Sequence, residues 1–264
     1  LVIALGAVTS LGVALADSFL DLGTTGREVI PSTASARALA GATLATLDPN
    51  VASINSPFGA VVTDKITVNV GFTHRLTTTE FEDQRFKSTN TIFPALTVIV
   101  PLKGFSILSG INLERKGRIE VASVDTVFAL TIYDLRYEKE SSLWSVPLLV
   151  STRIGNHLIL CGGLIFSFLD TREDYSVDFR SEEYSDTEHS LDTYAAGRGF
   201  AGGVMLDFPR ATFAVMVREG VDFDGNLERR NDQADLWQTE PFSASTLTSY
   251  RLGLSLRPKD CLLY

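Results

Sequence analysis

The chain has 264 residues, of which 45% are hydrophobic, and its formal net charge is −9 at pH 7. This length suits one large β domain, and the acidic balance argues against nucleic acid as a partner. No run of about 18 consecutive apolar residues occurs, so the sequence predicts no transmembrane helix. The acidic residues are concentrated in segments 170–192 and 219–240, between the expected strands.

The first 16 residues are small or apolar, and they end in Ala14-Leu15-Ala16 before Asp17. This pattern is typical of the apolar region and cleavage site of a secretory signal peptide. We therefore expect residues 1–16 to be the remnant of a leader and the protein to be exported. An exported chain without a helical anchor is periplasmic, secreted or an outer-membrane β-barrel, and the leader leaves these alternatives open.

Residues 17–63 lack the alternation that is typical of strands. The segment 32–47 is rich in Ala, Ser, Thr and Gly, and the turn-forming sequences Asp48-Pro49-Asn50 and Asn55-Ser56-Pro57 follow it. Small residues let turns and short helices pack closely in a confined space. One interpretation is a hatch, or plug, folded inside a lumen; the other is a loose segment behind the leader.

Strands are expected from residue 64 onward. In segment 66–75 apolar side chains alternate with polar ones, and a period of two predicts a strand with one apolar and one polar face. The turns Lys103-Gly104 and Gly155-Asn156 predict hairpins. Similar alternation occurs in segments 91–102, 105–114, 143–154, 157–169, 198–208, 211–219 and 248–257. Both soluble sandwiches and membrane barrels contain such strands.

The connections between these strands differ in length. Tight turns alternate with long polar segments, which we predict to be loops: 77–90, 115–142, 170–192 and 220–245. Short turns on one rim and long loops on the other are typical of outer-membrane barrels. The predicted fold is therefore all-β, an antiparallel transmembrane β-barrel over residues 64–264 that is incomplete at its C-terminus, behind a hatch at 17–63. We count about eight strands, or nine if segment 124–138 forms one.

The segment Ala36-Arg37-Ala38-Leu39-Ala40-Gly41-Ala42, followed by Asp48 and Asn55-Ser56-Pro57, resembles the hatch of the FadL-like outer-membrane barrels. That family includes a PorV-like branch, and the strand and turn at 250–260 also look similar. The resemblance extends from residue 32 to the end, although Asn55-Ser56-Pro57 replaces the usual Asn-Pro-Ala. It implies a hatch built on Arg37, Gly41, Asp48, Asn55 and Pro57.

The resemblance also implies a function. FadL-like proteins are channels for the uptake of hydrophobic, fatty-acid-like molecules across a bacterial-type outer membrane. The PorV-like branch implies instead an adaptor that binds protein partners of a secretion or surface-attachment system, here through the long loops. A third hypothesis, from the strand pattern alone, is a soluble β-sandwich binding module.

Several apolar side chains are candidates for the inner wall of a lumen. We expect a lumen-facing path for a hydrophobic small molecule or lipid, lined by Phe93, Ile99, Ile159, Ile165 and Leu169. In the fifth expected strand, alternation places the last three opposite the lipid-facing set. Both faces of the second strand are apolar, so the pattern leaves open which of them points inward. The alternative is that these residues only pack against the hatch.

No catalytic or metal site is expected. His74, His157 and His189 lie in separate segments, so no catalytic triad and no metal-binding spacing is present. The sequence around Asp224-Gly225 lacks two ligands of a calcium loop and is better interpreted as a turn. We therefore expect no enzymatic activity and no cofactor.

Overall fold

The computed structural model describes residues 13–16, 27–28, 43–81, 84–128, 131–181, 184–231 and 236–256. These residues form antiparallel strands, with two 3-10 turns, η3 (Pro49–Val51) and η4 (Pro57–Val62), as the helical elements. The prediction of an all-β antiparallel fold is therefore confirmed.

The long strands, from β3 to β8, follow one another in a simple meander. In the sheet order β11-β10-β8-β7-β6-β5-β4-β3, β8 pairs with β10 along one half of its length and with β9 along the other. Strand β12 pairs with β9, and β11 with β10. The bounds are β3 (Thr67–Phe81), β4 (Gln84–Leu102), β5 (Phe105–Phe128), β6 (Thr131–Ile154), β7 (Leu158–Phe179), β8 (Thr187–Asp207), β9 (Ala211–Arg218), β10 (Asp222–Asn231), β11 (Leu236–Ser245) and β12 (Ser249–Leu256).

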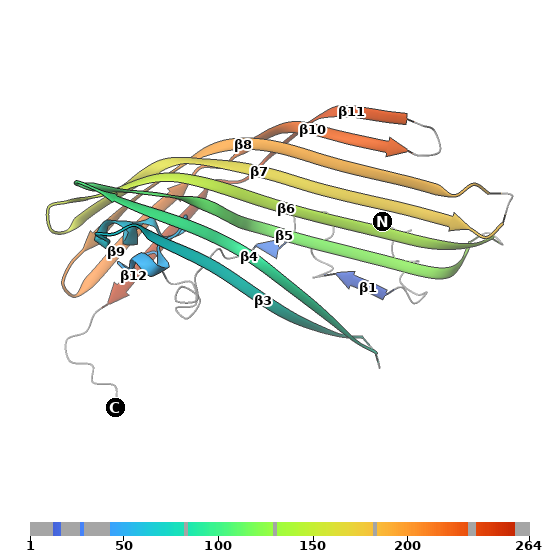
Figure 1. Ribbon diagram of the computed structural model, residues 1–264, viewed down its shortest axis with the longest axis horizontal. Helices are drawn as coiled ribbons and strands as arrows, with labels where there is room; N and C mark the ends of the chain where they lie inside the picture. The colour runs from blue at the N-terminus through green and yellow to red at the C-terminus, as the bar shows by residue number, and fades with distance from the viewer. Residues whose placement is uncertain are drawn as a thin grey trace.

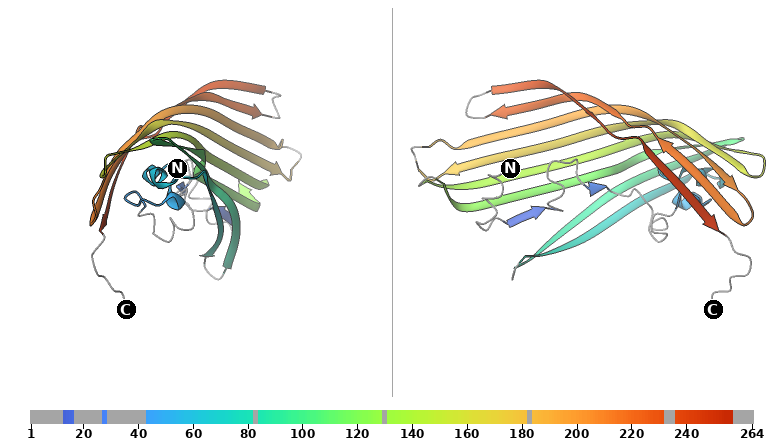
Figure 2. Two further views of the ribbon diagram at one scale, coloured as in Figure 1. Left: turned by 60° about the vertical axis from the view of Figure 1, so that its left-hand side comes forward. Right: turned by 180° about the vertical axis from the view of Figure 1, so that it is seen from behind.

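The sheet is long and strongly curved (Figure 1). Its concave side encloses the 3-10 turns, which lie at the end where β8 turns into β9 (Figure 2). Strand β3 forms one edge, and β11 and β12 form the other; these edges do not pair with each other among the described residues. The sheet is therefore open.

The tight turns are confirmed at one end of the sheet, which we call the short-turn end. Gly104 joins β4 to β5 with φ of 92°, and Gly155 joins β6 to β7 with φ of 63°. Both values lie in the left-handed region, which glycine adopts without steric cost. Sequence reasoning located these hairpins because their turn residues have this special chemistry.

The predicted long loops are wrong. Residues 115–128 and 131–142 form the far halves of β5 and β6, and described parts of the other three polar segments likewise extend β3–β4, β7–β8 and β10–β11. Strand pairing provides hydrogen-bond partners for the backbone N–H and C=O groups there. Cross-strand ion pairs such as Arg118–Glu138, at 2.7 Å, place opposite charges side by side. We call these polar, paired sections of the strands the ribbons, and this end of the sheet the ribbon end. A single polar strand lacks the apolar alternation on which the prediction depended.

Two short N-terminal strands use an edge that β4 leaves free. Strand β4 pairs with β5 only between Ala95↔Asn112 and Leu102↔Phe105. Beyond that point β5 pairs with β1 (Val13–Ala16) and β2 (Arg27–Glu28). The end of the expected leader thus lies in the sheet, residues 1–12 lie outside the described part, and leader cleavage remains a prediction. No helix in the described ranges is long and apolar enough to cross a membrane.

Candidate functional site

The concave face at the short-turn end is filled by residues 43–62, which we call the plug. Asp48 caps η3, because its carboxylate accepts a hydrogen bond from the Asn50 N–H at 2.8 Å. Pro49 and Pro57 begin the two 3-10 turns, where no backbone donor is needed. Gly59 allows the turns to meet, since a Cβ there would lie 2.4 Å from the Asp48 carbonyl oxygen.

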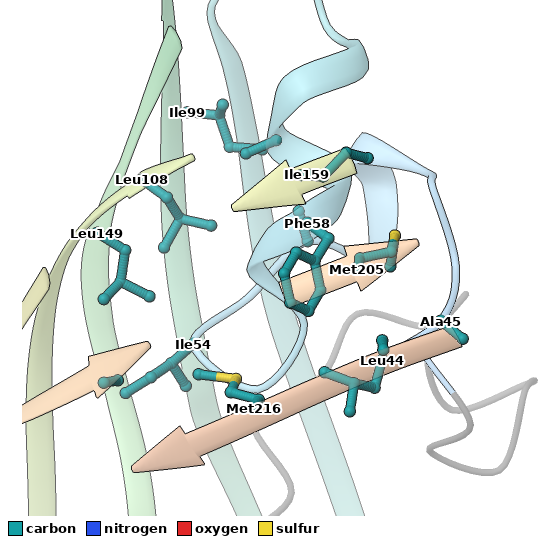
Figure 3. Close-up of a cluster of buried hydrophobic side chains, with 14 of the residues drawn as sticks. Leu44, Ala45, Ile54, Phe58, Ile99, Leu108, Leu149, Ile159, Met205 and Met216 are labelled. Carbon is teal, nitrogen blue, oxygen red and sulfur yellow. The ribbon is translucent and has the colours of Figure 1, made fainter. Parts of the chain in front are cut away.

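Apolar packing fixes the plug to the sheet. Phe58 is completely buried, and side chains from several strands surround it (Figure 3). The plug supplies one group of side chains to this core: Leu44, Ala45, Ala52, Ile54, Phe58 and Ala60. The sheet supplies the other: Ile99, Leu108, Leu149, Ile159, Ile165, Ala201, Met205, Ala214 and Met216. We call these residues together the plug core.

A few hydrogen bonds add direction to this packing. The Asn69 amide donates to the Pro49 carbonyl at 2.7 Å, and the Ser151 hydroxyl donates to the Pro57 carbonyl at 3.3 Å. Close backbone approach occurs at Gly203, where a Cβ would lie 2.9 Å from the Phe58 ring. The plug is thus held by shape and by a small number of directional contacts.

The predicted hatch residues have different local roles. Arg37 and Gly41 lie outside the described residues. Asp48 caps η3, Pro57 begins η4, and the Asn55 N–H donates to the Ser53 hydroxyl at 3.3 Å. Whether this segment moves as a hatch stays a prediction.

Four of the five predicted path residues face the concave side. Ile99, Ile159 and Ile165 are fully buried in the plug core. Leu169 belongs to a second apolar cluster nearer the ribbon end, which it forms with Leu143, Ala195, Val221 and Phe223. The described contacts of these residues are therefore packing contacts, and their role as a ligand path remains a prediction.

Phe93 faces the other way, so its predicted inward direction is wrong. Its side chain is 63% exposed and packs edge to face on Phe72, with ring centroids 5.3 Å apart. The register of β3 and β4 shifts between Gly71 and Thr73, which places an additional β4 residue opposite them. Such a bulge reverses the alternation, and Pro94 in the bulge has no N–H to lose from the ladder.

The convex face has an exposed apolar belt. One side chain from each of β3 to β9, and one from β12, define the belt. They are 40% to 81% exposed: Val70, Leu96, Ile111, Leu148, Leu164, Phe200, Val215 and Leu252. On β6 the convex positions from 144 to 154 are apolar apart from Thr152, and on β7 those from 158 to 168 are apolar or glycine. Charged residues follow on the same face, at Glu140 and Asp170.

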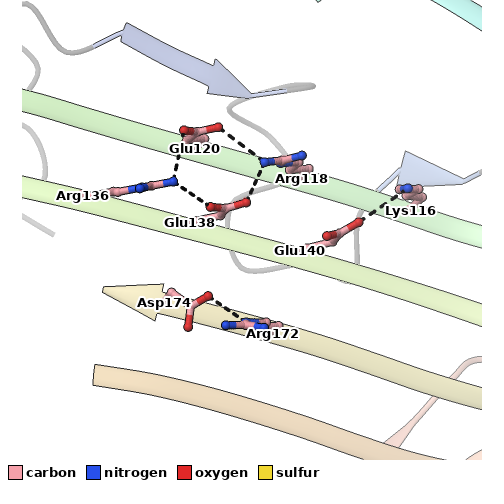
Figure 4. Close-up of polar contacts among 8 residues, drawn as sticks. All are labelled: Lys116, Arg118, Glu120, Arg136, Glu138, Glu140, Arg172 and Asp174. Carbon is pink, nitrogen blue, oxygen red and sulfur yellow. Dashed lines mark hydrogen bonds and ion pairs between the residues drawn. The ribbon is translucent and has the colours of Figure 1, made fainter. Parts of the chain in front are cut away.

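Beyond the belt, the convex face has a ladder of opposite charges on β5, β6 and β7 (Figure 4). Arg118 lies 2.7 Å from Glu138 and 3.7 Å from Glu120, and Lys116 lies 3.5 Å from Glu140. These side chains are partly or largely exposed, so each pair contributes about 0–1 kcal/mol. The ladder matches charge between neighbouring strands and does not itself bring catalytic groups together.

An open hollow of about 500 Å³ lies beside this ladder, where β6, β7, β8 and β10 meet. Its lining is polar and includes four acidic residues, Glu140, Asp170, Asp192 and Glu228, together with Arg172. The described residues contain no group of His, Cys, Asp and Glu side chains that could hold a metal ion.

The ribbon end of the concave face is polar. Lys139 on β6 lies 3.5 Å from Glu173 on β7. Burial, followed by the charge of Glu173, raises the pKa of the neighbouring Tyr137 to about 12. The phenol therefore stays protonated at physiological pH.

One concave feature was missed by sequence reasoning. Asn112, Ser145 and Ser167 are paired across β5, β6 and β7, and all three are essentially fully buried. We call them the polar row. Beside it, Glu114 on β5 and Arg218 on β9 form an ion pair of 2.6 Å between strands that are not neighbours. The signal in the sequence was a polar residue between apolar ones of the same phase, as at Ser167 between Ile165 and Leu169.

The fold and the filled concave face define a class: a curved antiparallel β-meander with an internal N-terminal plug and an apolar belt outside. Comparisons with protein-family models, curated proteins and solved structures found no match to this chain. The similarity to FadL-like barrels therefore depends on the sequence motifs alone.

Proposed function

We propose that this chain is a β-barrel protein of a bacterial-type outer membrane and a channel for uptake of hydrophobic, fatty-acid-like small molecules. The observation that carries the proposal is the combination of an apolar belt outside with a plug packed by apolar contacts inside. The resemblance to FadL-like barrels supplies the direction of transport.

The height of the belt supports the membrane part of the proposal. Eleven residues, from 144 to 154, make the apolar section of β6, and at ~3.3 Å per residue they extend ~36 Å along the strand. At the ~45° tilt of a barrel strand this corresponds to ~25 Å, the height of the apolar band on outer-membrane barrels. A soluble sandwich would bury such a face against a second sheet.

The contacts of the plug support the transport part. Beside the apolar contacts around Phe58, the side chains of Asn69 and Ser151 donate hydrogen bonds from the sheet to the plug. Apolar contacts have little directional preference, so a hydrophobic molecule can replace them at small cost. A shift of the plug would expose Ile99, Ile159 and Ile165 as the wall of a passage.

The experiment is uptake of a fluorescent long-chain fatty acid into proteoliposomes that contain the full-length protein. We expect uptake above empty liposomes, and faster uptake when Asn69→Leu and Ser151→Ala together loosen the plug. The control Asn226→Leu changes an exposed asparagine on β10 and should not alter the rate. Uptake no faster than in empty liposomes would exclude the channel function.

A second candidate, the protein-binding adaptor, is favoured by the ribbon end. Strands β5 and β6 each have 24 residues, more than twice the ~9–11 that cross a bilayer. The ribbons would therefore project well beyond the membrane and offer an extended charged surface to a protein. Native mass spectrometry of the protein extracted in mild detergent separates the two: a co-purified lipid-like mass supports transport, and a stoichiometric protein partner without one supports the adaptor.

A further inference from the structure

The polar row is unusual because its side-chain polar atoms have no hydrogen-bond partner among the described residues. The Asn112 amide nitrogen and oxygen and the Ser145 and Ser167 hydroxyls are all buried, and among the described residues none of them has a hydrogen-bond partner. The large majority of buried side-chain polar atoms in proteins have a hydrogen-bond partner. Three neighbouring exceptions in one row leave hydrogen-bonding capacity that a bound molecule can use.

The position of the row defines the shape of that molecule. Along β6 the row lies between Leu149, in the plug core, and Leu143, in the second apolar cluster. Along β7 it lies between Ile165 and Leu169 in the same way. A ligand that follows the concave face from the ribbon end therefore meets an apolar surface, then hydrogen-bonding groups, then the plug.

The charges beside the row define the chemistry of the ligand's polar group. Glu114 lies two residues from Asn112 on β5, and it neutralises Arg218 at 2.6 Å. An incoming carboxylate would face the Glu114 charge, whereas a neutral group would not. The amide and the hydroxyls both donate and accept, which suits a hydroxyl, an amide or a protonated carboxyl group.

We infer that the polar row binds the neutral hydrogen-bonding group of an otherwise apolar ligand, and that it prefers an alcohol to an ionised carboxylate. The inference depends on the proposed function, because the ligand is a molecule that the channel takes up and that meets the row before it meets the plug. It makes the substrate class more specific: the chain is apolar, and its polar group is uncharged when bound.

The test compares three probes of one chain length: 1-dodecanol, dodecanoate and dodecane. Each is equilibrated at pH 8 with full-length protein in octyl glucoside, and the bound probe is quantified by mass spectrometry. Dodecanoate is ionised at this pH. We expect dodecanol to bind about tenfold more tightly than dodecanoate or dodecane, from one to two additional hydrogen bonds.

Variants locate the preference. Ser145→Ala combined with Ser167→Ala should weaken dodecanol binding about tenfold while dodecane binding stays unchanged. Glu114→Gln should invert the selectivity in favour of dodecanoate, because Arg218 then lacks its counter-charge. Ser106→Ala, which removes another buried hydroxyl from the same face of β5, is the matched control and should change none of the three affinities.

The outcomes are distinguishable. If wild-type protein binds dodecanoate as tightly as dodecanol, the inference is wrong and the channel proposal stands. If it binds none of the three probes, both fall. Because the wild-type comparison needs no substitution, a variant that fails to fold, as judged by heat-modifiable migration, does not remove the test.

Discussion

At the scale of single residues, small side chains determine where the plug contacts the sheet. A Cβ at Gly203 would lie 2.6 Å from the Val215 carbonyl oxygen and 2.9 Å from Phe58. A Cβ at Gly253 would lie 3.0 Å from the backbone nitrogen of Ala45. On the opposite face, a Cβ at Gly162 would meet the Phe200 ring at an ordinary 3.5 Å. The concave glycines are therefore needed for packing, and the convex one is not.

This difference gives a prediction. Gly203→Ala should destabilise the protein by about 1–3 kcal/mol, because the new methyl group overpacks the plug core. Gly162→Ala, one strand away, should change stability little. Chemical unfolding in detergent, followed by the loss of β-sheet signal, measures both. Equal effects of the two substitutions would contradict the packing assigned to Phe58.

At the scale of elements, the ribbons extend the strands beyond the apolar belt. The backbones of residues 115–128 and 131–142 belong to the paired strands β5 and β6 rather than to a loop. Paired amides exchange with solvent only when the pair opens, whereas loop amides exchange at once.

Hydrogen exchange on the folded protein tests this pairing. We expect slow exchange for residues 116–122 and 136–142, in contrast to fast exchange at the turn of Gly155 and Asn156. Arg118→Ala should leave the protection almost unchanged, since exposed ion pairs contribute about 0–1 kcal/mol each. Fast exchange throughout 115–142 would restore the loop interpretation.

The elements also show what the sequence could predict. Turns with special chemistry, such as Lys103-Gly104, identified the hairpins, and alternation correctly oriented Ile159 and Ile165. The direction of Phe93 was not predictable, because both faces of its strand are apolar and one bulge reverses the phase. The polar row was also missed, because its three residues come together only when the register of three strands is known.

At the scale of the whole molecule, the belt and the ribbons divide every long strand into an apolar and a polar section. If the belt lies in a membrane, a charge within it is costly, and the same charge on the ribbon is not. Leu164 and Asp178 lie on the same face of β7, one in each section, and both are exposed.

We expect Leu164→Arg to destabilise the membrane-inserted state by about 2–4 kcal/mol, the cost of arginine near the bilayer centre. Asp178→Arg should have little effect. Folding into liposomes, measured by the fraction of heat-modifiable protein, compares the two. Two equally efficient variants would indicate that the belt faces something other than lipid.

The meander has a consequence for assembly. Each long strand pairs with its neighbour in sequence, so every hairpin closes a short segment of chain and the entropic cost of each step is small. The plug precedes β3 in the chain, and its core includes residues from β4 through β9. The plug segment is therefore available to every strand that follows, and its core is complete only when β9, which supplies Ala214 and Met216, is in place.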